Sequence, residues 1–181
     1  MKLVHAGQAM AVTAALLAIP FAAAPAAGAV TADAPERLGA RFTATLVARH
    51  SGRCLDVSGV STADGAILHQ WSCINGQPNQ EWTFVATSNG YYTLRASHSG
   101  KCLDVSGVST ADGAPVHQWT CLNNQRNQEW RLAQKDNGYF SLVARHSGKC
   151  LDVAGVSTAQ GAPVHQWTCI NGQPNQEWRL A

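Results

Sequence analysis

Apolar and polar residues alternate in short runs from about residue 41 to the end of the chain. Four such runs follow one another in the middle of the chain: residues 93–96, 102–105, 116–121 and 130–133. Alternation with a period of two is typical of β-strands that bury one face. Asp112-Gly113 and the Asn-rich residues 123–127 fall between the runs and predict a turn and a loop. The pattern predicts short strands and no helix.

The four runs recur three times with a constant spacing. Every Cys, every Trp and every His except His5 lies on a repeated position, 48 residues from its counterpart. The repeats cover residues 41–88, 89–136 and 137–181. Four strands in each predict an all-β domain of about twelve short strands in three pseudo-symmetric repeats. A propeller needs at least four blades, so three repeats must close in another way.

The first 29 residues have the pattern of a secretory signal peptide. Lys2 supplies a positive start, residues 9–24 are apolar, and residues 27–29 match the small-residue cleavage pattern. A second match at residues 32–34 allows cleavage at position 34 instead. A membrane-spanning helix is not expected, because the run is shorter than the ~20 apolar residues of a span and prolines interrupt it. We therefore expect a secreted, extracellular protein.

Residues 30–40 are polar and irregular, and they predict a short leader before the first repeat. Loss of residues 1–29 removes one charged side chain, that of Lys2, so the net charge falls from +2 to +1. Nucleic acids and anionic membranes attract strongly basic surfaces. Neither is an expected partner, and the chain is expected to be a monomer.

The six cysteines form pairs 19 positions apart, one pair in each repeat. In a secreted chain they predict disulfides, for which fifteen pairings are possible. Three pairings respect the threefold repeat, and the simplest bridges each repeat internally: Cys54–Cys73, Cys102–Cys121 and Cys150–Cys169. Each bridge would then close a loop of about 19 residues, worth about 3 kcal/mol by loop entropy. No metal or other cofactor is expected, because the Cys and His spacings are not those of metal sites.

The third strand of each repeat carries a Trp, and alternation along the strand indicates on which face of the sheet this Trp lies. In the first repeat Leu68 lies on one face, and His69, Trp71 and Cys73 lie on the other. If the face with Leu68, Val116 and Val164 is the core, the Trp faces outward. An exposed aromatic ring can stack on the apolar face of a pyranose.

A disulfide within the repeat would bring polar residues to this ring. Asp56 lies two residues after Cys54, and Asn79 and Gln80 lie six and seven residues after Cys73. One aromatic plate, one carboxylate and two amides can bind a polyol. The candidate carbohydrate-binding residues are Asp56, Trp71, Asn79 and Gln80; Asp104, Trp119, Asn127 and Gln128; and Asp152, Trp167, Asn175 and Gln176.

Each residue type also has a purely structural explanation. The Trp of each Gln-Glu-Trp is expected in the core: Trp82, Trp130 and Trp178. Gln80 and its copies could instead satisfy backbone groups or orient the Asp, and Asp56 could cap a turn. His50 and its copies, which precede Ser-Gly, are expected to be loop residues. The presence of all four residue types in three copies favours the sugar-binding interpretation.

Gly-Lys-Cys-Leu-Asp-Val, followed by Gln-Trp-Thr-Cys and Asn-Gln-Glu-Trp, resembles the ricin B-type lectins, also called carbohydrate-binding module family 13. The hallmark Gln-x-Trp stands at Gln80/Trp82, Gln128/Trp130 and Gln176/Trp178. The resemblance covers residues 41–181. It implies a β-trefoil of twelve strands, disulfides within the repeats and up to three sugar pockets. A polysaccharide or glycan, for example one containing galactose or xylose, is the partner it suggests.

The resemblance also gives each candidate a role. Asp56, Trp71 and the pair Asn79/Gln80, with their copies, match the pocket carboxylate, the stacking aromatic and the polar pair of the family. Four departures bear on which sugar is bound, and one is Gln160, which replaces the turn residue Asp64 or Asp112 in the third copy. The stacking residue is Trp where members often have Tyr, and Gln70, Gln118 and Gln166 stand where a core-facing hydrophobe precedes it. The residue after the second Cys is apolar where some relatives have a polar sugar contact: Ile74, Leu122 and Ile170.

Catalysis is not expected. Glycoside cleavage usually needs two carboxylates that flank the bond. Each repeat offers one pocket Asp, and the Glu of Gln-Glu-Trp is expected to face solvent: Glu81, Glu129 and Glu177. Every candidate group occurs three times, whereas catalytic sites are normally unique. The alternative to a lectin is a protein-interaction or protease-inhibitor trefoil, which would not need the Asp-Trp-Asn-Gln set in every copy.

Overall fold

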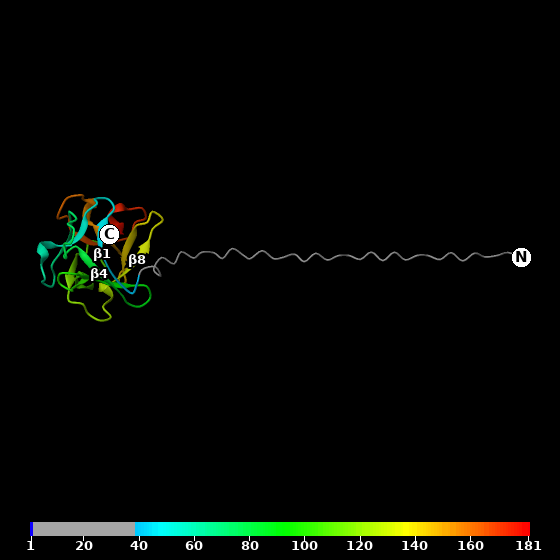
Figure 1. Ribbon diagram of the computed structural model, residues 1–181, viewed down its shortest axis with the longest axis horizontal. Coiled ribbons are helices and arrows are strands. Elements are labelled where there is room, and N and C mark those ends of the chain that lie inside the picture. Colours follow the sequence, from blue (N-terminus) through cyan, green and yellow to red (C-terminus); the bar gives the residue numbers. More distant parts are fainter. Residues whose placement is uncertain (2–38) are drawn as a thin grey trace. The chain divides into compact units, whose positions relative to one another are not determined.

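The computed structural model of the chain describes Met1 and residues 39–181 (Figure 1). The expected signal peptide, its cleavage positions and nearly all of the expected leader lie outside the described residues. Within them the chain forms twelve β-strands joined in one sheet, with only short 3₁₀ turns as helical structure. No helix in this part of the chain is long and apolar enough to cross a membrane.

Each repeat contributes four strands. The first has β1 (Arg41–Ala48), β2 (Cys54–Val57), β3 (Leu68–Trp71) and β4 (Glu81–Ala86). The second has β5 (Tyr92–Ala96), β6 (Cys102–Val105), β7 (Val116–Trp119) and β8 (Glu129–Gln134). The third has β9 (Phe140–Ala144), β10 (Cys150–Val153), β11 (Val164–Trp167) and β12 (Trp178–Leu180). The 3₁₀ turns are η2 (Ser58–Val60), η3 (Ser106–Val108), η4 (Arg126–Gln128), η5 (Ala154–Val156) and η6 (Pro174–Gln176).

The expected strands are all present, and they differ from the prediction at their ends. β5 and β8 are slightly longer than expected, whereas β7 ends at Trp119, two residues earlier. The strand stops there because Cys121 turns back to form its disulfide with Cys102. The expected loop after it closes in the short turn η4.

Six of the strands close into an antiparallel barrel. β1 pairs with β4 and β12, β5 pairs with β4 and β8, and β9 pairs with β8 and β12. The other six form one hairpin in each repeat: β2–β3, β6–β7 and β10–β11. A closed barrel has no free sheet edge. This arrangement, six barrel strands and three hairpins with threefold pseudosymmetry, is the β-trefoil that the resemblance implies.

The Trp of each Gln-Glu-Trp joins the barrel to the hairpin of its own repeat. Trp82, Trp130 and Trp178 are fully buried, as expected. Their indole N–H groups donate hydrogen bonds to the carbonyl oxygens of Leu55, Leu103 and Leu151 at 3.3, 3.0 and 3.1 Å. A buried Trp therefore fills the core and has its polar atom paired. Leu68, Val116 and Val164 are buried beside it, which confirms the expected core face of the third strand.

A buried Gln on each hairpin ties neighbouring repeats together. Gln70 in β3 is fully buried, and its Nε2 donates to the carbonyl oxygens of Ser157 and Ala159 at 2.6 and 2.8 Å. Gln118 and Gln166 make the same two bonds to the preceding repeat. Through these bonds the buried side-chain amide is fully paired, since an unpaired buried amide would cost stability. The position is thus a polar link between repeats.

The expectation that the Glu of each Gln-Glu-Trp faces solvent is wrong for two of the three. Glu129 and Glu177 are 6% and 3% exposed. They form ion pairs with Arg145 and Arg49, each of which comes from the repeat that follows in the ring. Glu81 is half-buried. Alternation places these side chains outside the barrel, and the neighbouring repeat then covers them.

Candidate functional site

The hairpin of each repeat aligns the candidate residues across its two strands. Asp56 in β2 lies opposite His69 in β3, and Cys54 lies opposite Trp71. All six cysteines are paired within their repeats: Cys54–Cys73, Cys102–Cys121 and Cys150–Cys169. Each disulfide fixes the end of the third strand, and with it the chain that leaves the Trp. The simplest of the symmetric pairings is therefore the one found.

A buried carboxylate forms the base of the site. Asp56 is 4% exposed, and its Oδ1 and Oδ2 accept hydrogen bonds from His69 Nε2 at 2.9 Å and Gln80 Nε2 at 2.8 Å. The equivalent distances are 3.0 and 2.8 Å at Asp104 and 2.9 and 2.8 Å at Asp152. Each Oδ1 can accept a further bond, and so can Oδ2 of Asp56 and Asp152, whereas Oδ2 of Asp104 also accepts from Asn127 at 3.0 Å. The base of the site therefore offers a fixed pair of acceptors to a ligand that donates.

An aromatic plate stands beside this carboxylate. Trp71, Trp119 and Trp167 are 38%, 39% and 39% exposed, as expected for the outer face of the strand. The ring of Trp71 stacks on His69, with centroids 5.3 Å apart and an interplanar angle of 19°. Its Cζ3 lies 3.7 Å from the position that a Cβ on Gly161 would occupy. That distance is ordinary van der Waals contact, so the glycine is favoured here by its φ of +77°, which places a turn of the third repeat beside the plate of the first.

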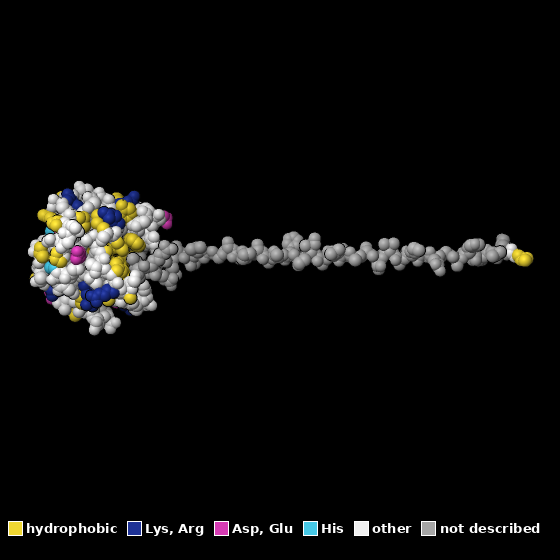
Figure 2. All heavy atoms as spheres, in the orientation of Figure 1, with side chains coloured by type: hydrophobic (Ala, Val, Ile, Leu, Met, Phe, Trp, Pro, Cys, Tyr) yellow, Lys and Arg dark blue, Asp and Glu magenta, His cyan; other side chains and the backbone are white. Residues whose placement is uncertain are grey.

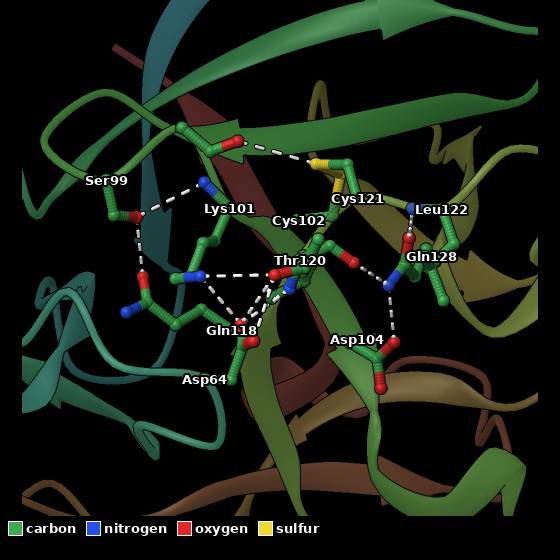
Figure 3. Close-up of a disulfide and its surroundings, with 12 residues drawn as sticks. Asp64, Ser99, Lys101, Cys102, Asp104, Gln118, Thr120, Cys121, Leu122 and Gln128 are labelled. Carbon is green, nitrogen blue, oxygen red and sulfur yellow. Dashed lines mark hydrogen bonds and ion pairs between the residues drawn. A yellow bond between two sulfur atoms is a disulfide. The ribbon is translucent and has the colours of Figure 1, made fainter.

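The two amides expected at the site have different surroundings. Asn79 lines the pocket; its Nδ2 donates to the carbonyl oxygen of Val57 at 3.0 Å, and its Oδ1 has no hydrogen-bond partner among the described residues. Gln80 is fully buried behind Asp56. Besides its bond to Asp56, it donates to the carbonyl oxygen of Ser72 and accepts from the amide of Ile74. In Figure 3 the equivalent Gln128 joins Asp104 to Leu122 in this way.

The geometry gives the Gln a positioning role. It orients the carboxylate and fixes the chain just after the disulfide. This is the structural role that the sequence allowed for Gln80 as an alternative to sugar contact. The Asn is the amide that reaches the pocket wall.

Several further residues line these pockets and were not among the candidates, and two of them, His69 and Val60, bear on how the site is built. The pocket of the first repeat is lined by Asp56, Ser58, Gly59, Val60, His69, Trp71, Ile74, Gln77 and Asn79, and the third has the matching set from Asp152 to Asn175. His69 was placed on the face of Trp71 by alternation but was given no role. Val60 follows Gly59 in the turn η2, and nothing in the sequence around it indicates that its side chain lines the pocket. No three His, Cys, Asp or Glu side chains between residues 39 and 181 gather as a metal site would require.

Ion pairs between repeats hold the strand end that follows the Trp. In the second repeat, Asp64 from the first repeat accepts from the Thr120 amide at 2.7 Å and pairs with Lys101 at 2.7 Å (Figure 3). The hydrogen bond from Lys101, with those from Thr120, holds the pKa of Asp64 below its usual value. Lys149 and Thr168 lower the pKa of Asp112 in the same way.

The third junction replaces this ion pair with neutral acceptors. Gln160 stands where the other two junctions have Asp, and Arg53 stands where they have Lys. Arg53 donates to the carbonyl oxygen of Thr158 at 2.8 Å and to Ser72 Oγ at 2.9 Å. The two replacements occur at the same junction and are compatible with each other. The Arg53 guanidinium donates to a backbone carbonyl, whereas Lys101 and Lys149 at the other two junctions pair with a carboxylate.

Comparisons with known proteins agree with this geometry. The model of the ricin-type beta-trefoil lectin domain matches residues 42–179. The designed threefold-symmetric protein ThreeFoil is 51% identical, with a TM-score of 0.73, over 77% of this chain and 97% of that one. No curated protein matches the chain.

Two natural proteins of known structure are also similar. An exo-beta-1,3-galactanase from Clostridium thermocellum is 36% identical, with a TM-score of 0.72, over 77% of this chain and 30% of its own. The Macrolepiota procera ricin B-like lectin, solved with lactose, is 25% identical, with a TM-score of 0.67, over 79% of this chain and 96% of its own. With the family match over most of the chain, the fold and the residues of each hairpin lead to one conclusion: this chain belongs to the ricin-type β-trefoil lectin family.

Proposed function

We propose that this chain is a secreted, non-enzymatic lectin with one sugar pocket in each repeat. The observation that carries the proposal is the triplicated site, in which a half-exposed Trp stands beside a buried carboxylate and a pocket-lining Asn. A pyranose can place its apolar face on the ring while two neighbouring hydroxyls donate to the carboxylate. The similarity to a lectin solved with lactose supports a carbohydrate ligand.

Three pockets on one scaffold suit a repeating or clustered ligand. Each site is a shallow pocket with few polar groups, so a single sugar is expected to bind weakly. Simultaneous engagement of linked sites can raise the apparent affinity by about 10²–10⁴. The protein is therefore expected to prefer polysaccharides or clustered glycans over free sugars. The three disulfides suit an extracellular location, in line with the expected signal peptide.

The carboxylates of each repeat are engaged in ways that favour binding over catalysis. The pocket Asp accepts from His and Gln in all three repeats, and Glu129 and Glu177 are held by Arg. Since the same set occurs three times, no repeat has a unique pair of carboxylates of the kind that cleaves glycosides.

Retention on a panel of polysaccharides and glycans tests the proposal. The triple variant Asp56→Asn, Asp104→Asn, Asp152→Asn keeps the side-chain size and removes the charged acceptor, so it should lower retention by about 10²-fold. Asp136→Asn changes an exposed acid in a turn outside the pockets and should leave retention unchanged. Replacing the three half-exposed Trp residues by Ala should abolish retention while circular dichroism still reports a folded protein.

Two results would contradict the proposal. One is normal retention by both triple variants, which would show that the pockets are wrongly assigned. The other is failure of the unmodified protein to bind any glycan, which would favour a protein-interaction trefoil.

A further inference from the structure

Exposed large hydrophobic side chains gather almost entirely at the pockets. Between residues 39 and 181 ten such side chains are exposed, and nine of them are three copies of one set: Val60, Trp71 and Ile74; Val108, Trp119 and Leu122; Val156, Trp167 and Ile170. The tenth is Ile67. Figure 2 shows hydrophobic side chains gathered in small patches on a surface with scattered charges. Exposed apolar patches of this kind mark binding surfaces.

The Val of each set is held in an unfavourable backbone conformation. Val60, Val108 and Val156 have φ angles of 54°, 53° and 54°, in the left-handed region that β-branched residues avoid. Such positions cost stability and cluster at binding sites. Asn or Gly would fit there without strain, and the preceding residue in each copy is already Gly. A strained Val repeated three times on a pocket rim indicates that its isopropyl group contributes to binding.

The Ile or Leu of each set is held in place by a neighbouring disulfide and by a hydrogen bond from its backbone amide. Ile74 is 49% exposed and follows Cys73, which is tied to Cys54. Its amide donates to Gln80 Oε1 at 2.9 Å, the same glutamine that holds the pocket carboxylate. Leu122 and Ile170 are held by the same bond, at 2.9 and 2.8 Å. The apolar rim and the polar base are therefore positioned together by one buried side chain.

The pocket thus combines acceptors at its base with an apolar rim. A sugar whose hydroxyls reach Asp56 presents its remaining edge to Val60 and Ile74. A hydroxyl over these two side chains would find no hydrogen-bond partner on either of them, whereas a methyl group would gain apolar contact with both. Building on the proposed function, we propose that the rim pairs, Val60 and Ile74 with their copies, select pyranoses that carry a methyl group. The methyl can be that of a 6-deoxyhexose or that of an acetamido sugar.

Matched sugars test the inference on the full chain. Competition for retention on a bound polysaccharide compares D-galactose with 6-deoxy-D-galactose and with N-acetyl-D-galactosamine, and the corresponding D-glucose series follows. The 6-deoxy arm and the acetamido arm distinguish the two sources of the methyl group. At least one methyl-bearing sugar should compete about four- to tenfold better than its parent, the effect of burying one methyl group.

Two rim variants connect this preference to the proposed residues. In the triple variant Ile74→Asn, Leu122→Asn, Ile170→Asn, the methyl-bearing sugar and its parent should compete almost equally, so that the ratio of their competition strengths is close to one. The change Val60→Asn, Val108→Asn, Val156→Asn should also lower the ratio, and it should raise the melting temperature because Asn tolerates a positive φ. Ile67→Asn is the matched control, since it removes an exposed Ile outside the pockets and should leave the ratio unchanged.

The outcomes separate this inference from the proposed function. Equal competition by parent and methyl-bearing sugars overturns the inference and leaves the lectin proposal intact, as does competition by none of them while a polysaccharide is retained. A preference that survives in both rim variants also overturns it. Absence of retention on every glycan overturns both proposals.

Discussion

The pocket residues and the Glu of each Gln-Glu-Trp both occur three times in this molecule, yet their contacts are repeated with different strictness. At the pockets the distance from the carboxylate to the His is 2.9, 3.0 and 2.9 Å, and the distance to the Gln is 2.8 Å in every repeat. The Trp plates differ in exposed fraction by one percentage point. The pocket residues, including the strained Val, are nearly identical in all copies.

The Glu contacts between repeats are complete at two places and incomplete at the third. Glu177 pairs with Arg49, which lies over the ring of Tyr139, and Glu129 pairs with Arg145, which lies over Tyr91. At the third place the corresponding residues are Glu81, Ser97 and Thr43. Ser97 keeps the backbone bond, from its amide to the Glu81 carbonyl at 2.9 Å, but it lacks the cation.

The difference shows which contacts need a fixed geometry. A ligand requires its acceptors, plate and rim at set positions, so a change at one pocket residue alters that pocket directly. A junction requires only that buried polar groups are paired, and a less buried Glu can be satisfied by water. The following changes break or extend the comparison.

Removing a cation from a complete junction should have the largest effect. In Arg145→Ala the carboxylate of Glu129, which is 6% exposed, loses its ion-pair partner. The free energy of unfolding should fall by about 3 kcal/mol, measured by urea denaturation. Arg131→Ala is the control: it removes an exposed Arg of β8, the strand that carries Glu129, and should hardly lower the free energy of unfolding. A loss below about 1 kcal/mol at Arg145 would mean that water already pairs Glu129.

Removing the positioning glutamine should affect one pocket and the fold together. In Gln128→Leu the side-chain volume is nearly kept, but the Leu122 amide loses its acceptor, and Asp104 Oδ2 keeps only the bond from Asn127. The free energy of unfolding should fall by about 2 kcal/mol, because buried polar groups are left unpaired. Binding at the other two pockets should persist, so polysaccharide retention should fall only in part. Gln134→Leu, at the exposed end of β8, is the control; complete loss of retention in Gln128→Leu would contradict independent pockets.

Much of this arrangement could be predicted from the sequence, and the rest depends on contacts between repeats. Alternation and the 48-residue spacing predict the twelve strands, the core Trp residues and the outward Trp plates. They do not show that Arg145 covers Glu129, because strand alternation describes one strand and not the neighbour that packs outside it. They also do not show that Val60 has a positive φ, since a β-branched residue predicts the opposite. The role of His69 could have been found, because it shares a face with Trp71 and pairs across the hairpin with Asp56.

Acid should weaken two of the three junctions between repeats, namely those held by the ion pairs Asp64–Lys101 and Asp112–Lys149. The pKa of Asp64 and that of Asp112 lie below the usual 3.8, because of Lys101 and Lys149. A carboxyl with a lowered folded pKa stabilises the protein above its unfolded pKa, and the contribution disappears as the pH falls through the folded value. The stability difference between the protein and Asp64→Asn, Asp112→Asn should therefore be constant above about pH 5 and vanish well below pH 4.

The third junction provides the comparison for this titration. It holds Arg53 on a carbonyl and has Gln160 in place of the acid, so Gln160→Asp should add a third acid-sensitive contact. Asp136→Asn, an exposed acid outside the ion pairs, should leave the pH profile unchanged. A stability difference that persists unchanged below pH 3 would show that the carboxylates stabilise the junctions without their charge.

Completing the incomplete Glu contact should have the smallest effect, and it is the sharpest test of the comparison. Ser97→Arg places a guanidinium on a backbone that already matches the other two, since the amides of residues 49, 97 and 145 all donate to the carbonyl of the facing Glu at 2.8 to 2.9 Å. The gain in unfolding free energy should be about 0.5 kcal/mol, because Glu81 is only half-buried. Adding Thr43→Tyr should contribute about 0.5–1 kcal/mol more by placing a ring beneath the cation. Ser97→Gln controls for side-chain length without charge. If the double variant is no more stable than this control, the incomplete contact is already satisfied by water, and its departure from threefold symmetry has no energetic consequence.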